Sequence, residues 1–280
     1  MRQPLLVINA IGGLANRLRA IGWALHTASL TGRCLRIVWA VNDDLHASFT
    51  DLFDGIDIPV ITPGPVSYAL EWELPRRKNL YVSTLWQRMH FSRVFTDTRG
   101  IPEYFDRPDD FIMALDKTAG NILISSGLTL DIEASARFYS LCHPIAEVQE
   151  LIDKRTSRFN DSTVGVHIRR TDNAQSIGRS PLRLFEEEMA RRIALNPDVN
   201  FFVCSDDRSV MYRLKECFGA RIICGDTDAS RTTLSGMRNA TADMFALART
   251  SVILGSYWSS FSETAAMIGN IPLQVIKTPD

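Results

Sequence analysis

Residues 165–173 read GVHIRRTDN, and this stretch decides how the second half of the chain folds. The apolar residues that begin at Thr163 predict a buried strand that ends near Ile168. Four polar or charged side chains then fall within six positions: His167, Arg169, Arg170 and Asp172. Open α/β sheets bind their ligands at the carboxyl ends of their strands. The stretch therefore predicts a ligand site at the end of a strand.

The two adjacent arginines favour an anionic ligand. Guanidinium groups placed side by side repel each other and are costly to remove from water. They become useful against a doubly negative group such as a diphosphate, because each arginine can donate two hydrogen bonds to phosphate oxygens. A surface ion-pair network is the alternative interpretation of Arg169 and Arg170.

Strands and helices alternate on both sides of this stretch. The second half predicts strands at 163–168, 200–204, 221–224, 251–255 and 273–276, with helices at 181–195, 208–218, 241–249 and 262–268. Ser180 is expected to cap the first of these helices, with Pro181 in its first position. The first half predicts a strand at 5–9, a helix at 14–30 and a strand at 35–39, then weaker signals for strands at 79–83 and 121–125 and a helix at 111–117. This alternation predicts an α/β fold with parallel, doubly wound sheets, in domains at 1–140 and 141–280.

Composition and charge narrow the classes of function. The 280 residues are 45% hydrophobic and 22% charged, as in an ordinary globular protein. A net charge of -1 argues against binding nucleic acid or anionic lipid through bulk electrostatics. No window approaches the roughly 20 apolar residues of a membrane span. Five cysteines without a CxxC pair suit a reducing compartment, and without a signal peptide we expect a cytoplasmic location.

A second candidate site lies at residues 12–19, which read GGLANRLR. Two glycines allow a tight turn after a strand and bring backbone amides close to a ligand. The helix N-terminus that follows adds partial positive charge, so Gly13, Asn16 and Arg17 are predicted to contact an anion. The alternative is a simple turn that leaves Asn16 and Arg17 in solvent.

Residues 204–207 read CSDD and form a third candidate site after another strand. Ser205, Asp206 and Asp207 offer oxygen atoms that suit a divalent metal or the hydroxyl groups of a sugar or ribose. The alternative is that one aspartate merely caps the helix that begins near residue 208.

The fourth candidate site combines Asp243 with residues 256–264, which read SYWSSFSET. Ser260, Ser262 and Thr264 place hydroxyl groups at a helix start, where unpaired amides attract an anion. Capping alone explains one serine, and charge–dipole attraction alone explains Glu263 or Asp243 in a first turn. Because neighbouring parallel strands end at one edge of a sheet, the three sites of the second half are expected to converge on one crevice.

In order along the chain, GVHIRRTDN, the strand ending in CSDD, and ADMFALARTSVILGSYWSSFSET resemble the three-motif signature of the fucosyltransferase superfamily. That superfamily includes α1,6-enzymes (the rhizobial nodulation enzyme among them), α1,2-enzymes and protein O-fucosyltransferases. The opening GGLANRLRA is similar to that of related members, whereas roughly residues 30–140 carry no matching motif. The resemblance implies a GT-B-like architecture of two Rossmann-like domains facing across a cleft, with GDP-fucose held mainly by the C-terminal domain.

The resemblance also implies roles for individual residues. Arg169 would grip the β-phosphate with Arg170 as a second cation, and His167 and Asp243 would line the guanosine pocket. The residues implied around the diphosphate are Ser260, Ser262, Glu263 and Thr264, with Asp206 and Asp207 as an acidic pair near the donor.

The implied reaction is inverting transfer of fucose to a hydroxyl of a glycan or other acceptor, without a metal or other cofactor. Asn173 and Ile177 stand where α1,6-enzymes have a lysine and a glutamate, so the family's base does not transfer. Asp172 and Glu263 are the remaining candidates.

Acceptor contacts are expected from the first domain, where Trp39, Trp72, Trp86 and His90 either stack on sugars or belong to the core. Three alternatives stay open: another nucleotide-sugar donor, a non-catalytic nucleotide- or glycan-binding protein of the same fold, and a metal-dependent sugar-nucleotide hydrolase using Asp206 and Asp207.

Overall fold

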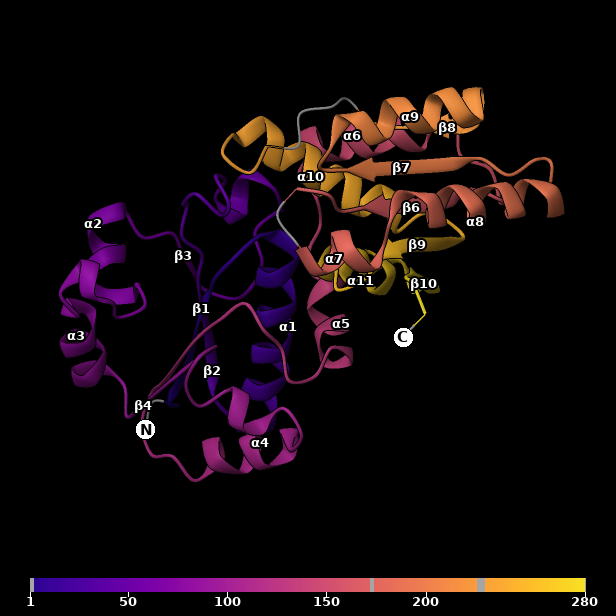
Figure 1. The fold of residues 1–280 in the computed structure, drawn as a ribbon. Coiled ribbons are helices and arrows are strands. Elements are labelled where there is room, and N and C mark those ends of the chain that lie inside the picture. The colour runs from indigo at the N-terminus through magenta and orange to yellow at the C-terminus, as the bar shows by residue number, and fades with distance from the viewer. Residues whose placement is uncertain (1–2, 172–173, 226–229, 280) are drawn as a thin grey trace. The chain divides into compact units, whose positions relative to one another are not determined.

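The structure is a computed structural model that describes residues 3–171, 174–225 and 230–279. The chain forms two compact units (Figure 1). Unit 1 contains Met1–His143 and a returning segment, Arg231–Leu234. Unit 2 contains Pro144–Ser230 and Ser235–Asp280. The backbone amide of His46 donates a hydrogen bond of 3.0 Å to the carbonyl of Arg231, so the returning segment is tied into unit 1.

Unit 1 is built on a five-stranded parallel sheet in the order β3-β2-β1-β5-β4. Its strands are β1 Leu5–Ala10, β2 Cys34–Val38, β3 Val60–Ile61, β4 Arg93–Thr96 and β5 Ile122–Ser126. Its main helices are α1 Leu14–Leu30, α3 Val82–His90 and α4 Pro108–Asp116, with short turns α2 Pro65–Ser67 and α5 Ala136–Tyr139. Figure 1 shows α1 and α3 on opposite faces of this sheet.

Local sequence explains how unit 1 begins. β1 reads LLVINA and is almost entirely buried, which suits a central parallel strand. Gly12 has a φ of +80°, and an added Cβ there would lie 3.1 Å from the side-chain nitrogen Nδ2 of Asn16. The turn into α1 therefore requires glycine. Gly32, with a φ of +60°, lies just beyond the end of α1. The predicted strand, helix and strand at 5–39 are confirmed within one residue.

The predictions for the middle of unit 1 have mixed outcomes. The helix near 111–117 and the strand near 121–125 are confirmed as α4 and β5. The strand predicted at 79–83 is wrong, because this segment is a 3-10 turn that leads into α3. The apolar residues of this segment are not buried: Leu80 is 80% exposed, and Val82 is 44% exposed.

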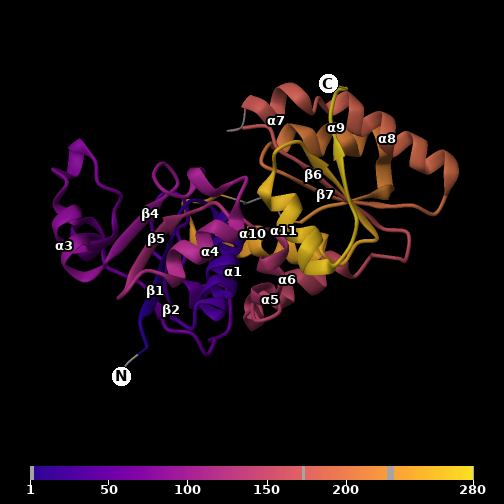
Figure 2. The same ribbon diagram turned by 90° about the horizontal axis from the view of Figure 1, so that it is seen from below.

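Unit 2 has its own five-stranded parallel sheet, in the order β10-β9-β6-β7-β8. Its strands are β6 Val164–Ile168, β7 Phe201–Ser205, β8 Ile222–Ile223, β9 Val252–Ser256 and β10 Leu273–Ile276. Its helices are α6 Ala146–Thr156, α7 Ala174–Arg179, α8 Leu182–Leu195, α9 Arg208–Phe218, α10 Leu234–Leu247 and α11 Ser260–Gly269. Apolar residues of α8 and α9 pack on β6 and β7 in one core cluster, and α10 and α11 lie on the other side of the sheet (Figure 2).

The chain order of this sheet creates a topological switch point. Strands β6, β7 and β8 run outward in one direction, and the chain then returns to place β9 against the other side of β6. The loops after β6 and β9 therefore leave the sheet toward opposite faces, which is where open α/β sheets bind their ligands. The predicted GT-B-like α/β fold with Rossmann-like units is confirmed by these two parallel sheets.

Two details of unit 2 correct the sequence prediction. Ser180 does not cap α8: its Oγ donates to the carbonyl of Ile276 at 2.5 Å and accepts from the amide of Tyr257 at 2.8 Å, while Pro181 occupies the cap position. α10 begins at Leu234 rather than near residue 241. Within the described ranges, no helix combines the length and apolarity that crossing a membrane requires.

Candidate functional site

The three segments predicted to converge in the second half do meet, at the carboxyl ends of β6, β7 and β9. The Arg169 amide donates to Ser256 Oγ at the end of β9 with a distance of 3.1 Å. The Arg170 amide donates to Asp206 Oδ1 just after β7 at 2.7 Å. Both arginines thus begin the loop at the switch point, held from either side.

His167 lies near the carboxyl end of β6 and links this strand to the start of α11. It is 8% exposed, its ring stacks on Phe261 with centroids 4.7 Å apart, and its Nδ1 lies 2.8 Å from Ser262 Oγ. Burial lowers the pKa of His167 from 6.5 to about 4; Asp206 opposes this shift and Arg169 adds to it. At neutral pH the imidazole is therefore uncharged and adds no third cation beside the arginines.

The depressed pKa of His167 predicts a loss of stability in acid. Between pH 6.5 and about 4, the unfolded chain binds a proton at His167 that the folded chain does not. The free energy of unfolding therefore falls as pH falls through this window, by about 3 kcal/mol in total. Urea unfolding across this pH range should show a shallower dependence for His167→Gln than for the native chain. An unchanged slope in the variant would contradict the buried, neutral state.

Gly255 sets how closely α11 approaches β9. A Cβ at Gly255 would lie 2.8 Å from the Ser262 Oγ and 2.9 Å from a methyl carbon of Leu273. Gly255→Ala is therefore expected to push the start of α11 away and lower the free energy of unfolding by about 1–3 kcal/mol. Gly178→Ala is the matched control, since nothing lies within 4 Å of its added Cβ and it sits in α7. Thermal unfolding of both variants tests this; equal stabilities would contradict it.

The N-terminus of α11 follows β9, the strand that pairs with β6. Ser262 and Thr264 are buried, while Ser260 and Glu263 are half-buried. The N-cap Ser259 makes no side-chain capping bond; its Oγ lies 3.3 Å from His167 Nδ1 instead. First-turn amides have no partner inside their own helix, and the helix dipole adds partial positive charge. This arrangement can accept an anion next to the arginine loop.

Asp206 holds the arginine loop in place. Besides the Arg170 amide, its carboxylate accepts hydrogen bonds from the amide and the hydroxyl of Thr171, at 3.2 and 2.7 Å. Asp207 caps α9 by accepting from the Ser209 amide at 2.8 Å, as the alternative interpretation predicts, and its own amide donates to Ser205 Oγ. No group of three or more His, Cys, Asp or Glu side chains suited to a metal occurs in the described part of the chain.

Asp243 has a partner that sequence reasoning missed. Arg155 Nε donates to its Oδ1 at 2.6 Å, and Arg155 Nη2 donates to Asn239 Oδ1 at 2.8 Å. The Arg155 side chain is 2% exposed and that of Asp243 is 16% exposed. Burial raises the pKa of Asp243, and the charge and hydrogen bond of Arg155 oppose the rise. Oδ2 has no hydrogen-bond partner among the described residues and stays available.

Arg155 gives no sequence signal for this role. It lies in the last turn of α6, where a basic residue is expected from the helix dipole alone. An added Cβ on Gly225 would lie 2.7 Å from Arg155 Nε, so the chain passes closely over the guanidinium.

The first-half candidates lie in unit 1. Arg17 is fully buried: it donates to the carbonyls of Gly12 and Ala40 at 2.8 and 2.5 Å and to Asn42 Oδ1 at 2.9 Å. Burial lowers its pKa to about 10. Its guanidinium thus braces the loops after β1 and β2, so the alternative of a solvent-exposed Arg17 is wrong. Gly13 is the N-cap of α1 without a side-chain cap, and Asn16 is half-buried.

The remaining candidates divide between core, surface and undescribed chain. Trp39 and Trp72 are buried, which supports their core interpretation, whereas the half-buried Trp86 stacks on the exposed His90 at 4.3 Å. Asp172 and Asn173 lie outside the described residues. Contact of Gly13, Asn16, Arg17 and the residues at the ends of β6, β7 and β9 with a nucleotide stays a prediction.

Solved structures with a similar fold include fucosyltransferases. NodZ alpha-1,6-fucosyltransferase soaked with GDP-fucose has a TM-score of 0.65 and 19% identity, over 95% of this chain and 93% of that chain. POFUT1 in complex with GDP-fucose has a TM-score of 0.60 and 13% identity, over 98% of both chains. A mutant of Arabidopsis thaliana FUT1 in complex with GDP has a TM-score of 0.66 and 16% identity, over 100% of this chain and 72% of that chain. Neither a family model nor a curated protein matches the sequence. The chain therefore has the fold of these fucosyltransferases, as its motifs predict.

Proposed function

We propose that this protein is an inverting, metal-independent glycosyltransferase that moves fucose from GDP-fucose to a hydroxyl group of a glycan or other acceptor. The observation that carries the proposal is the meeting of Arg169, Arg170 and the start of α11 at the switch point of unit 2. Solved structures of the same fold include complexes with GDP-fucose and GDP. The motifs in the sequence match the same superfamily.

In the proposed reaction, unit 2 holds the donor. Arg169 and the first-turn amides of α11, with Ser260, Ser262 and Thr264, bind the diphosphate. Asp243 accepts a guanine N–H through Oδ2 while Arg155 fixes Oδ1. Neutral His167 orients Ser262 and lines the guanosine pocket. Asp206 holds the loop that begins with Arg169 and Arg170 in position, and Asp207 caps the N-terminus of α9.

The chemical step exchanges one C–O bond for another. The bond between fucose C1 and the β-phosphate oxygen breaks as the acceptor oxygen bonds to C1 from the opposite face. Negative charge that builds on the departing GDP is stabilised by Arg169, Arg170 and α11. The acceptor proton passes to Asp172 or Glu263. The five free thiols suit a reducing cytoplasm, where nucleotide-activated sugars are made.

Nucleotide binding and turnover test the proposal in separate steps. Calorimetry should show that GDP binds and UDP does not, and a GDP-release assay over a panel of GDP-sugars should favour GDP-fucose. Single-turnover assays separate an enzyme from a binding protein, because a binding protein would hold GDP without releasing fucose. Full loss of turnover in EDTA, or turnover with a different donor only, would overturn the proposal.

A further inference from the structure

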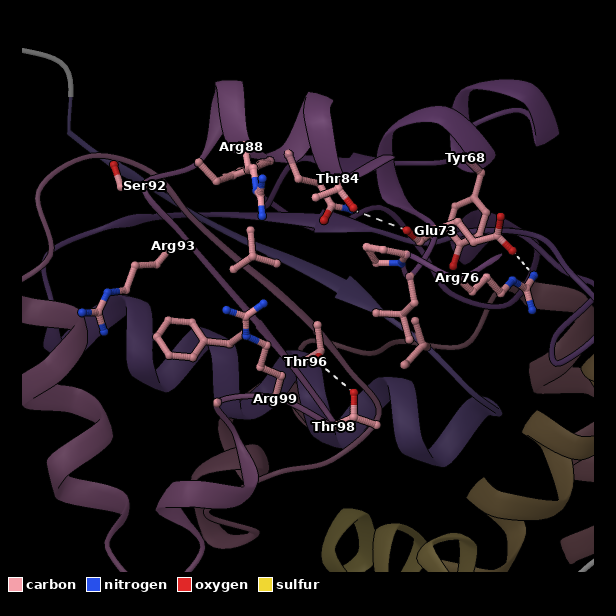
Figure 3. A pocket seen from close by; sticks show the side chains of 18 of the residues that line it. Tyr68, Glu73, Arg76, Thr84, Arg88, Ser92, Arg93, Thr96, Thr98 and Arg99 are labelled. Carbon is pink, nitrogen blue, oxygen red and sulfur yellow. Dashed lines mark hydrogen bonds and ion pairs between the residues drawn. The ribbon is translucent and has the colours of Figure 1, made fainter. Parts of the chain in front are cut away.

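Unit 1 contains a large open pocket that none of the predicted donor residues lines (Figure 3). Its volume is 1260 Å³, above the roughly 300–1,000 Å³ of common small-molecule sites. Its walls come from α3, from β4 with the turn that follows, and from segments 42–44 and 73–76. The pocket has room for several sugar rings.

Three arginines from different elements line this pocket. Arg88 lies on α3, Arg93 begins β4, and Arg99 lies in the turn after β4. Throughout the described chain, none of their guanidinium groups has a hydrogen-bond or ion-pair partner. Figure 3 shows the side chains of Arg88 and Arg99 pointing toward each other from opposite walls. Like charges placed this way repel, so an anion between them is stabilising.

The acidic residues of the pocket form no described ion pair with these arginines. Glu73 is already bound to Arg76 and to the Asn79 amide. Asp43 and Asp44 come from a separate loop, and no described ion pair joins them or Glu103 to the three arginines. The four acidic residues of the lining balance its four arginines in formal charge, so what distinguishes Arg88, Arg93 and Arg99 is that no described carboxylate forms an ion pair with them.

The other walls suit a carbohydrate. Hydroxyl groups come from Thr84, Ser92, Thr96 and Thr98. Tyr68 and Tyr104 add half-buried aromatic rings, which combine an apolar surface with a polar tip. A few placed polar groups among apolar surfaces are typical of a binding site that fixes the orientation of its ligand.

We infer that this pocket binds an anionic carbohydrate whose carboxylate, sulfate or phosphate group lies between Arg88 and Arg99. The assignment of this carbohydrate as the fucose acceptor rests on the proposed function. The binding site itself rests on the geometry of unit 1 alone.

A glycan array tests the charge class directly. Labelled full-length protein is applied to uronic acid, sulfated and phosphorylated oligosaccharides beside their neutral parents. We expect binding to at least one anionic class, with the neutral parent of each bound sugar at least tenfold weaker, and the spots identify which anion is recognised. Binding confined to neutral sugars, or no binding to any anionic class, would overturn the inference.

Substitution of Arg88 and Arg99 tests whether these residues bind the anionic sugar. Arg88→Gln and Arg99→Gln should each weaken the affinity for the bound anionic sugar about 10- to 100-fold, as expected when a charge-assisted hydrogen bond is lost. Arg77→Gln is the matched control, because Arg77 is exposed on the same unit but does not line the pocket. Unchanged affinity in both pocket variants, or equal loss in the control, would refute the site.

GDP binding by the same variants keeps this test separate from that of the proposed function. Normal GDP affinity with no anionic-sugar binding would refute only the pocket. Anionic-sugar binding without GDP binding would refute only the donor assignment.

Discussion

Arg169→Ala is expected to lower the rate of fucosyl transfer about 10²- to 10³-fold while the protein stays folded. The reason is that Arg169 starts the loop at the switch point, where its amide donates to Ser256. In the proposed reaction its guanidinium stabilises the charge that grows on the departing diphosphate. The effect should appear mainly in kcat, because this charge is larger in the transition state than in bound GDP-fucose. Steady-state rates with GDP-fucose measure it.

Two variants frame the Arg169 result. Arg169→Lys keeps the charge but loses the two-pronged donor geometry, so its rate should fall between those of the native and alanine proteins. Arg183→Ala removes an exposed arginine whose ion pair in the described chain is with Glu187 on α8, and it should leave turnover unchanged. Near-native turnover in Arg169→Ala would remove this residue from the proposed mechanism.

Arg155→Met is expected to lower the free energy of unfolding by about 3–5 kcal/mol, the largest stability effect that the structure predicts. The change leaves the carboxylate of Asp243 buried without its opposite charge, and it also leaves Asn239 Oδ1 without its donor. GDP affinity should fall as well, since nothing then fixes Oδ1 of Asp243. Urea unfolding and GDP calorimetry measure the two effects.

The double variant and a surface pair complete this test. Arg155→Met with Asp243→Leu removes both charges, so it should recover much of the lost stability and none of the GDP binding. Arg249→Met breaks an exposed pair with Asp153 and should change stability by about 0–1 kcal/mol. Arg155→Met with the same small effect would show that the buried pair does not stabilise unit 2.

Helices and strands whose ends are marked by glycine could be predicted from the sequence. α1 and its flanking strands are correct because glycines mark both ends of the helix and one continuous apolar face runs between them. The convergence of the arginine loop, Asp206 and α11 could also be predicted, because each follows an apolar strand of one parallel sheet. Strand ends are a property of local sequence, so this part of the site needs no long-range information.

Other features depend on tertiary contacts that no local pattern reports. The start of α10 is hidden because Asn239 and Thr241 are buried polar residues, one bonded to Arg155 and the other to the Met237 carbonyl. β4 spans only four residues, Arg93–Thr96, which is too short to show the alternation of apolar and polar residues that predicts a strand. Arg17 follows a glycine turn at a helix start, where the sequence predicts contact with an anion. Only the structure shows that its guanidinium donates to the backbone carbonyls of Gly12 and Ala40.

The returning segment Arg231–Leu234 has a consequence for how the protein is made. A ribosome finishes the first 143 residues before it reaches this segment. Unit 1 can therefore fold completely only after Arg231–Leu234 has also been synthesised. A gene fragment that stops at His143 should therefore yield a less stable product than the same fragment supplied with the missing peptide.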